Sequence, residues 1–280
     1  MIFRYPGGKA KKSVREKIIS LFPKEYSEYR ESMVGGGGIF FHIPVDKKRW
    51  INDLDINLIS VYRALKEDSK NFIEKCRKIE PILKNEKLTS AREGGKNLYS
   101  LRLKEVFDKL VESVDEDPAL RYFFIHRTVW AGRVRYDIKS RMYFSNPNGW
   151  NIIKTDKLEK AAKILKDVKV SSIDYDSLLF EDGKDVLIYI DPPYMCNTEL
   201  SNSSRLYFHN FEIKDHEKLF YSLKECKHKF VLSYDNNDFI KKLYKDFNIV
   251  ETQWTYCGTS SANGINTKKT KGKELIIKNF

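Results

Sequence analysis

The run Val186–Ile190, followed by Asp191, Pro192, Pro193 and Tyr194, constrains the fold of this chain more than any other stretch. Its short, uninterrupted apolar pattern, rich in β-branched side chains, predicts a parallel strand buried on both faces. The prolines end the strand, because neither can donate to a sheet ladder and each restricts the residue before it. We therefore expect Asp191 and Tyr194 at the carboxyl edge of an open α/β sheet, where such sheets bind ligands.

The turn after this strand suits a flat ligand that carries an amino group, such as a nucleobase. The Asp191 carboxylate and the Pro192 carbonyl supply hydrogen-bond acceptors, and the Tyr194 ring supplies a stacking face. A strand followed by an ordinary surface turn would give the same residues, so the rest of the chain has to separate the two interpretations.

Composition indicates a globular protein that binds a polyanion. The 280 residues, 41% of them hydrophobic, are enough for one large domain or two modest ones with a real core. The net charge of +12 favours a nucleic-acid partner, although a lysine-rich proteome would produce the same charge. High aromatic content, 13%, would supply stacking surfaces as well as core.

Cysteine usage and hydropathy predict a cytoplasmic protein with reduced thiols. Cys76, Cys196, Cys226 and Cys257 are far apart and form no C-x-x-C pair, so neither disulfides nor a zinc site is expected. The chain has no long apolar span and no signal sequence, and we expect no membrane partner.

Two glycine segments precede predicted helices. Gly7 and Gly8 lie just before Lys9 and a basic helix, and Gly35–Gly38 separates the strand-like Tyr29–Val34 from an apolar helix start at 39–41. A strand, a glycine turn and a helix start bring backbone amides against a cofactor. The Gly-Lys-Ser/Thr of a phosphate-binding loop is missing, which disfavours an NTPase. A flexible loop is the alternative interpretation.

A second strand, Arg49–Asn52, ends at an acid. Asp53 follows the glycine loop at the spacing expected for a carboxylate that binds a ribose diol. Asp55 is the competing candidate, and either acid could instead cap the following helix.

The middle of the chain predicts a helical insert that leads into a hairpin. Residues 68–122 are charged and helical in pattern, and residues 123–137 and 141–149 interleave arginines with aromatic residues around a glycine. Such side chains can contact guanine edges and wedge into the base stack. A solvated, salt-bridged hairpin is the alternative. The predicted boundaries are 1–66 and 154–280 for the catalytic domain and 67–153 for the insert.

The remaining chain returns to alternating helices and strands. We expect a helix at 157–166, a strand at 168–170 that ends near Asp174, a strand at 230–234 and a final pair at 253–256 and 274–277. This alternation indicates a doubly wound sheet that is interrupted once. The polar, lysine-containing loop 258–273 could order on phosphates.

An ordered set of segments resembles a known family. F-R-Y-P-G-G-K (3–9), Y-R-E-S-M-V-G-G-G-G-I-F-F (29–41), I-N-D-L-D-I-N-L-I (51–59) and I-D-P-P-Y (190–194) are similar to the Dam-like (alpha-group) DNA adenine-N6 methyltransferases. The resemblance continues in H-R-T-V-W-A-G-R-V-R-Y (126–136) and T-S-S-A-N-G-I-N-T-K-K (259–269). Two departures stand out: Glu31-Ser32-Met33 replaces the usual Glu-Pro-Phe, and Trp130-Ala131 replaces a frequent Tyr-Asn.

The resemblance implies a Rossmann-like S-adenosylmethionine-dependent methyltransferase sheet with an inserted, mostly helical DNA-recognition domain. It implies metal-free methyl transfer to the exocyclic amine of a flipped adenine in double-stranded DNA, with GATC as the leading candidate site. The implied catalytic residues are Asp191, Pro192, Pro193 and Tyr194. The implied cofactor-binding residues are Tyr5, Pro6, Gly7, Gly8, Lys9, Gly35, Gly36, Gly37, Gly38, Asp53, Asp174 and Asp191. The implied DNA-binding residues are Arg4, Arg127, Trp130, Arg133, Arg135, Tyr136, Lys268 and Lys269.

Other functions remain open from the residues alone. The same turn could act on cytosine-N4 or on RNA adenine, or a non-catalytic nucleic-acid-binding subunit could keep the fold. A dinucleotide oxidoreductase would share the glycine loop and the acid, but it would not explain the D-P-P-Y turn. We expect a monomer, and a cognate restriction endonuclease is a candidate partner.

Overall fold

The computed structural model describes residues 2, 5, 7–85, 92–93, 96–97, 109, 112, 117–128, 134–136, 142–144, 155–195, 211–255 and 271–280. The helices of these residues are α1 (Lys12–Ile19), the 3-10 turn η1 (Phe40–His42), α2 (Ile56–Glu67), α3 (Ser69–Asn85), α5 (Pro118–Thr128), α6 (Thr155–Leu165), α7 (Asp176–Phe180), α8 (Ile213–Glu225) and α9 (Asp238–Leu243). The strands are β1 (Glu28–Glu31), β2 (Lys48–Asn52), β3 (Arg92–Glu93), β4 (Lys96–Asn97), β5 (Val134–Tyr136), β6 (Met142–Phe144), β7 (Val168–Ser171), β8 (Val186–Ile190), β9 (Lys229–Asp235), β10 (Asn248–Thr255) and β11 (Lys271–Lys278).

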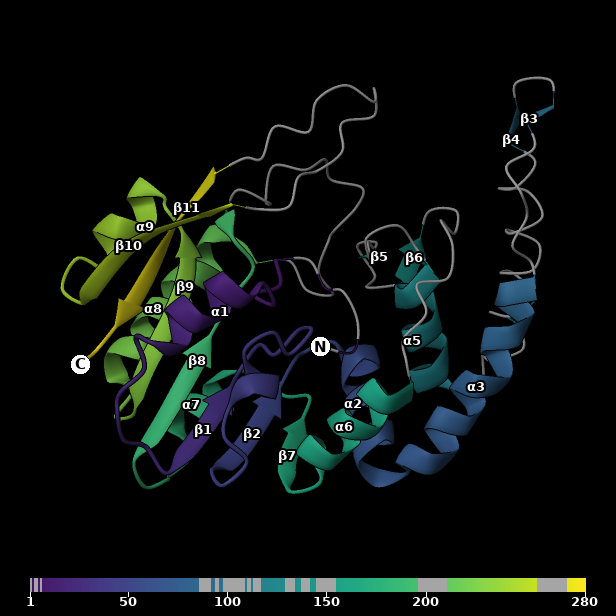
Figure 1. The fold of residues 1–280 in the computed structure, drawn as a ribbon. Helices are drawn as coiled ribbons and strands as arrows, with labels where there is room; N and C mark the ends of the chain where they lie inside the picture. The colour runs from purple at the N-terminus through teal and green to yellow at the C-terminus, as the bar shows by residue number, and fades with distance from the viewer. Residues whose placement is uncertain are drawn as a thin grey trace.

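A seven-stranded sheet in the order β10-β11-β9-β8-β1-β2-β7 forms the centre of the molecule (Figure 1). The five strands from β9 to β7 are parallel to their neighbours, whereas β11 is antiparallel to β9 and β10. From β1 the chain moves outward to β2 and β7 and then returns to β8 on the other side of β1. This order confirms the predicted doubly wound α/β sheet, and its switch point lies between β1 and β8.

Strand β8 is buried along its whole length, as its apolar run predicts. Leu187 and Tyr189 belong to one hydrophobic core, whereas Val186, Ile188 and Ile190 belong to the other. This alternation is the period of two that a strand imposes on its side chains. The strand therefore supplies both cores at once, and its carboxyl end is fixed by packing on both faces.

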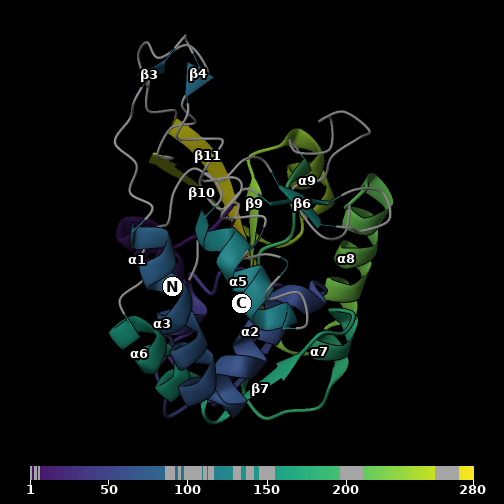
Figure 2. The ribbon, with the colours of Figure 1, turned by 90° about the vertical axis from the view of Figure 1, so that its right-hand side faces the viewer.

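Helices complete the two cores. Side chains of α1, α2 and α6 join the core that contains Leu187, and side chains of α7, α8 and α9 join the other. Helices α2, α3, α5 and α6 lie together at the β7 end of the sheet in both views (Figures 1 and 2). Although α3 and α5 lie within residues 67–153, their Phe72 and Phe123 share a core with Leu58 of α2.

Two local predictions need correction. The expected apolar helix at 39–41 is only the single turn η1, because Ile43 is extended before Pro44, where α-helical dihedral angles are disfavoured. The expected hairpin begins later than residue 123, because helix α5 continues to Thr128, with Phe123 and Phe124 on its buried side. The hairpin itself is the antiparallel pair β5 and β6.

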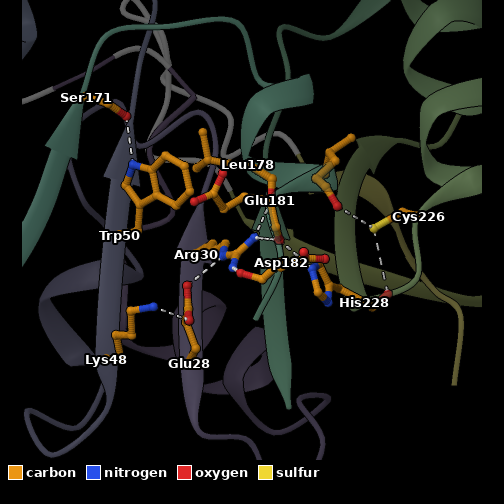
Figure 3. A network of polar contacts seen from close by, with 11 residues as sticks. Glu28, Arg30, Lys48, Trp50, Ser171, Leu178, Glu181, Asp182, Cys226 and His228 are labelled. Atoms are coloured by element: carbon orange, nitrogen blue, oxygen red, sulfur yellow. Dashed lines mark hydrogen bonds and ion pairs between the residues drawn. The ribbon is translucent and has the colours of Figure 1, made fainter. Parts of the chain in front are cut away.

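A buried arginine joins strand β1 to the connection that leads into β8 (Figure 3). Arg30 is fully buried and donates from Nη1 to the carbonyl oxygens of Leu178 and Glu181, both at 2.7 Å, and from Nη2 to that of Asp182 at 2.9 Å. Its Nε donates to Glu28 Oε1 at 2.7 Å. The guanidinium thus satisfies carbonyl groups that α7 and the following turn would otherwise leave without donors.

The close packing around Arg30 also explains why residue 183 is a glycine. A Cβ on Gly183 would lie 2.6 Å from Arg30 Nη2 and 2.5 Å from a Val186 methyl group, so a larger residue would displace the network. Burial alone would raise the pKa of Glu28, but the hydrogen bonds from Arg30 and Lys48 outweigh it and lower that pKa. Glu28 therefore remains an ionised partner of the arginine at neutral pH.

We expect Arg30→Met to lower the free energy of unfolding by about 3–5 kcal/mol, because it takes the buried guanidinium from the buried Glu28 carboxylate and leaves three carbonyl groups, the Leu178 carbonyl buried among them, without this donor. Urea denaturation followed by circular dichroism measures the change. The control is Lys48→Met, which removes an exposed cation, 73% accessible, from the same Glu28 and should cost about 1 kcal/mol or less. Equal losses in the two variants would contradict an anchoring role for Arg30.

Candidate active site

Predicted site residues meet at the carboxyl ends of the central parallel strands. Asp191 follows β8, Asp53 follows β2 and Asp174 lies just beyond β7. Glu31 ends β1 between them. Because these strands are parallel, their carboxyl ends lie at the same edge, beside the switch point between β1 and β8.

The ion pair of Lys9 with Asp191 fastens the N-terminal segment to this edge. Lys9 Nζ lies 2.8 Å from Asp191 Oδ1 and 2.9 Å from Oδ2, and it also donates to the Gly7 carbonyl at 3.0 Å. The lysine is buried, with 4% of its surface exposed. Burial raises the pKa of Asp191, and the charge and hydrogen bonds of Lys9 oppose that rise. Removing Lys9 would leave a buried carboxylate without its cation.

Tyr194 lies against the same ion pair. Its hydroxyl donates to Glu274 Oε2 at 2.9 Å and lies 3.3 Å from Asp191 Oδ1. Lys9 Nζ is 4.8 Å from the centre of the Tyr194 ring, within the range of a cation–π interaction. Of the other two residues of the turn, Pro192 is buried and Pro193 is partly buried. The D-P-P-Y turn is therefore built into the protein and is not an ordinary exposed turn.

The glycine loop packs closely against the N-terminal segment. Gly35 and Gly37 have positive φ angles of 47° and 68°, which side chains with a Cβ rarely adopt. A Cβ on Gly35 would lie 2.8 Å from the Tyr5 ring, and one on Gly38 would lie 3.0–3.2 Å from the backbone of Lys9 and its neighbour. Gly36 lies between them in the same loop. These glycines thus bring Tyr5 and Lys9 to the end of β1.

Asp53 and Asp55 have different roles. Asp53 Oδ2 accepts from the Gly35 amide at 2.9 Å, so the acid lies directly beneath the glycine loop. Burial raises the pKa of Asp53 to about 7, while hydrogen bonds from the Asp55 and Gly35 amides oppose the rise. Asp55 is fully buried, caps α2 by accepting from Asn57 and Leu58, and accepts from the Tyr122 hydroxyl at 2.8 Å. Asp55 is therefore a structural cap, and Asp53 is the acid available to a ligand.

Glu31 is an acid of this edge that sequence analysis did not single out. It is 2% exposed and accepts from the Tyr29 hydroxyl at 2.6 Å. Burial raises its pKa well above the ordinary value, the hydrogen bond from Tyr29 opposes this, and the charges of Asp191 and Asp53 raise it further. Its signal in the sequence was its position, at the end of a strand just before the glycine loop.

Apolar side chains lie at the outer part of the edge. Leu54 and Ile173 are each 39% exposed, and the Ser172 hydroxyl donates to the Leu54 carbonyl at 3.3 Å, which joins the two loops. Asn52 braces the same region, because its side chain bonds both the amide and the carbonyl of Ile173 at 3.0 and 2.9 Å. Asp174 is exposed and pairs with Lys218 at 3.3 Å.

One predicted DNA-binding residue lies on helix α5 and not on the expected hairpin. Arg127 lies in the last turn of α5 and is only 9% exposed, and its DNA contact stays a prediction. The apolar spacing that buries Phe123 and Phe124 extends the helix through this arginine. The backbones of Arg135 and Tyr136 lie on β5. Other predicted site residues lie outside the described residues: Arg4, Pro6, Trp130, Arg133, Lys268 and Lys269.

Strand order and site together define a class of protein. A parallel sheet with one reversed strand beside its edge, and with a glycine loop and acids at its switch point, is the arrangement of the S-adenosylmethionine-dependent methyltransferase fold. The model of the D12 class N6 adenine-specific DNA methyltransferase family matches residues 5–257. The chain belongs to this family and is an adenine-specific DNA methyltransferase.

Three relatives are similar to this chain over nearly its full length. The chain is 27% identical to the type II methyltransferase M1.LlaDCHI of Lactococcus lactis subsp. cremoris, over 99% of this chain and 94% of that protein. It is 28% identical to the type II methyltransferase M.MjaIII of Methanocaldococcus jannaschii, over 99% and 98% of the two chains. It is 24% identical to the type II methyltransferase M.CviBI of Paramecium bursaria Chlorella virus NC1A, over 100% and 99%.

Neither a metal-binding cluster nor a membrane-spanning helix occurs among the described residues. The described part of the chain contains no group of three or more His, Cys, Asp or Glu side chains arranged to hold a metal ion. Each helix within the described ranges is too short or too polar to cross a lipid bilayer.

We expect Asp55→Ala to destabilise the fold by about 2–4 kcal/mol, because it removes a helix cap and leaves the buried Tyr122 hydroxyl without this acceptor. The control is Asp68→Ala, since Asp68 is exposed and accepts from the Asn71 amide near the start of α3. The control should cost about 1 kcal/mol or less. Chemical denaturation compares the two variants, and a loss at Asp55 no larger than at Asp68 would be evidence against the structural assignment.

Proposed function

We propose that the methyl donor is S-adenosylmethionine and that it binds over the glycine loop, between Asp53 and Asp191. The observation that carries this proposal is the set of carboxyl groups gathered at one sheet edge around Lys9. In this proposal Asp53 binds the ribose diol, and Tyr5, Lys9 and the glycine loop form the adjoining wall. Gly7, Gly8 and Asp174 flank the same region, and Pro6 belongs to the same sequence segment.

The charge of the site supports a cationic cofactor. Glu31, Asp53 and Asp191 place three acids at one sheet edge, and burial raises the pKa of each, so their ionised forms are unfavourable unless a further cation offsets the charge. S-adenosylmethionine carries both a sulfonium and an ammonium group, so its binding favours the ionised acids. A neutral nucleoside would not do so.

The apolar residues of the edge fit the rest of the cofactor. Leu54 and Ile173 leave part of their surface exposed beside Asp53. An adenine ring between them would cover apolar surface, at about 25 cal/mol for each Å² removed from water. Asn52 holds the Ile173 loop in place, so this wall is already formed before the ligand binds.

The chemistry proposed for the D-P-P-Y turn follows from its acceptors. When bound, S-adenosylmethionine supplies an electrophilic methyl group. The amine of adenine is a weak nucleophile, because its lone pair is delocalised into the ring. Asp191 and the Pro192 carbonyl accept its hydrogens and shift electron density to nitrogen, while Tyr194 stacks on the flipped base. Asp191 also contacts the amine and, as a base, accepts the proton that the nitrogen loses. Pro193 keeps the turn rigid, and rigid placement supplies much of the acceleration.

We expect Asp191→Asn to reduce DNA methylation at least about a hundredfold, because it removes the charged acceptor from the target amine. The measurement is incorporation of the labelled methyl group into DNA, followed by digestion to nucleosides, which identifies N6-methyladenine as the product. The control is Asp238→Asn, the same change at an exposed position on α9. Full activity of Asp191→Asn would overturn the assignment of the active site.

Cofactor affinity should rise with pH up to about 7 and then level off. The pKa of Asp53 is about 7, so below this pH the carboxyl is protonated and loses both its charge and an acceptor for the ribose. Binding favours the ionised form, and each pH unit below 7 then costs up to about tenfold in affinity. Calorimetric titration with S-adenosylmethionine from about pH 5.5 to 8.5 measures this dependence.

The control for this titration is Asp53→Asn, which has no titrating carboxyl group. Its affinity should be lower than that of the wild type at pH 8 and nearly constant over the same pH range. If the variant keeps the slope of the wild type, another group causes the pH dependence and the assignment of Asp53 fails.

The target sequence and partners belong to the same proposal. We assign DNA contacts to Trp130, Arg133, Arg135 and Tyr136, and to Arg4, Lys268 and Lys269, on the strength of the positive charge and the aromatic pattern of these segments. GATC is the candidate site, and a monomer acts on it. The relatives are named type II methyltransferases, which supports a cognate restriction endonuclease as partner. Sequencing of methylated positions in exposed genomic DNA identifies the site.

A further inference from the structure

Glu274 is a buried acid outside the D-P-P-Y turn and the glycine loop. It lies on β11, two strands from β8 in the sheet, and only 1% of its surface is exposed. Its neighbours Leu275, Ile276 and Ile277 are completely buried apolar residues. A carboxyl group in such a place lowers stability unless it has a specific partner. A structural role alone would be filled better by another apolar residue.

Glu274 has such a partner in the active site. Tyr194 donates its hydroxyl hydrogen to Glu274 Oε2 at 2.9 Å, whereas Asp191 Oδ1 lies farther from the same hydroxyl, at 3.3 Å. Burial, with the charges of Asp191 and Glu274, raises the pKa of Tyr194 well above its ordinary value. The phenol therefore stays protonated, and it has one hydrogen to give to one of two carboxyl groups.

The contact fixes the far end of the tyrosine ring. Pro192 and Pro193 restrict the backbone that carries Tyr194, and Glu274 holds the hydroxyl at the opposite end of the side chain. The Tyr234 ring lies 6.1 Å away on β9, the strand between β8 and β11. A ring held at both ends has less freedom to lose when a base stacks on it.

The contact also protects the acceptor on Asp191. Lys9 already donates to both oxygens of Asp191. If the Tyr194 hydrogen also turned to Asp191 Oδ1, it would compete with the adenine amine for the remaining lone pairs of that oxygen. Because Glu274 takes the phenol hydrogen, Asp191 Oδ1 stays available to the substrate.

We propose that Glu274 is a positioning residue that orients the Tyr194 ring for the target base and keeps the tyrosine hydroxyl from occupying Asp191. This inference rests on the proposed function, in which Asp191 accepts from the amine and Tyr194 stacks on the base. Glu274 itself touches neither the base nor the cofactor in this arrangement. Its effect should therefore be on the methyl-transfer step and not on cofactor binding.

The test variant is Glu274→Leu, because leucine suits the apolar strand and cannot accept a hydrogen bond. We expect the single-turnover rate of DNA methylation to fall about tenfold or more, since the phenol hydrogen moves to Asp191 and the ring loses its anchor. The affinity for S-adenosylmethionine, measured by calorimetry, should change less than about twofold, within the scatter expected of a residue without contact. Glu274→Gln keeps an acceptor oxygen and should restore most of the rate.

A double-mutant cycle with Tyr194→Phe separates this role from general damage. Phenylalanine has no hydroxyl hydrogen to misdirect, so Glu274→Leu should slow the Tyr194→Phe enzyme less than about twofold. The same substitution at Glu251, exposed on the neighbouring strand β10, is the control and should leave the rate unchanged.

Three results would overturn the role of Glu274. They are an unchanged rate in Glu274→Leu, a loss of cofactor affinity as large as the loss of rate, or the same fold-change in rate in the wild-type and Tyr194→Phe enzymes. Should Glu274→Leu fail to fold, the cycle is measured with Glu274→Ala, to which the same three results apply, and Glu274→Gln remains the variant expected to keep most of the rate. Failure of the proposed function is distinct, because the wild-type protein would then neither bind S-adenosylmethionine nor methylate DNA.

Discussion

The pairing of Lys9 with Asp191 is the interaction on which the rest of the site depends. It joins residues 182 positions apart in the sequence and places the Lys9 ammonium group 2.8 Å from the carboxylate of the D-P-P-Y turn. Burial opposes the ionisation of Asp191, and Lys9 offsets part of that cost. The glycines at 35 and 38 make the pairing possible, because any side chain there would meet Tyr5 or the backbone beside Lys9.

The acids of this edge oppose folding when they are ionised. Asp53 binds its proton more tightly in the folded protein, with a pKa of about 7 against 3.8, so its contribution to stability is present at low pH and is lost as pH rises to about 7. The pKa of Glu31 is also raised, so its contribution to stability changes with pH in the same direction. Stability must therefore come from elsewhere, and the Arg30 network and the two cores flanking β8 supply it. A bound cationic ligand favours the ionised acids, so their ionisation then stabilises the folded state instead of opposing it.

Local pattern predicts strand β8, the doubly wound class of the sheet and the place of Asp53 at a strand end, because period, proline and strand-end chemistry act over a few residues. Pattern alone does not show Glu274, since its role depends on a contact with Tyr194 across 80 positions of sequence. Asp55 could not be separated from Asp53 for a similar reason: its partner Tyr122 lies on a distant helix. Arg127 was expected in the hairpin and lies in α5, because arginines beside aromatic residues suit a hairpin as well as the end of a buried helix.

Helix α5 packs against two loops at the carboxyl edge of the sheet. Its Tyr122 hydroxyl binds Asp55, two residues after Asp53, and the ring of its His126 stacks near that of Tyr5 at a centroid distance of 6.2 Å. Tyr5 in turn packs on Gly35. Helix α5 therefore contacts the loop after β2 directly and reaches the glycine loop through Tyr5. Because Asp55 and Tyr122 are buried, a shift of α5 would move Asp55 as well, and Tyr5 with it, so α5 couples the segment proposed for DNA recognition to the proposed methyl-transfer site.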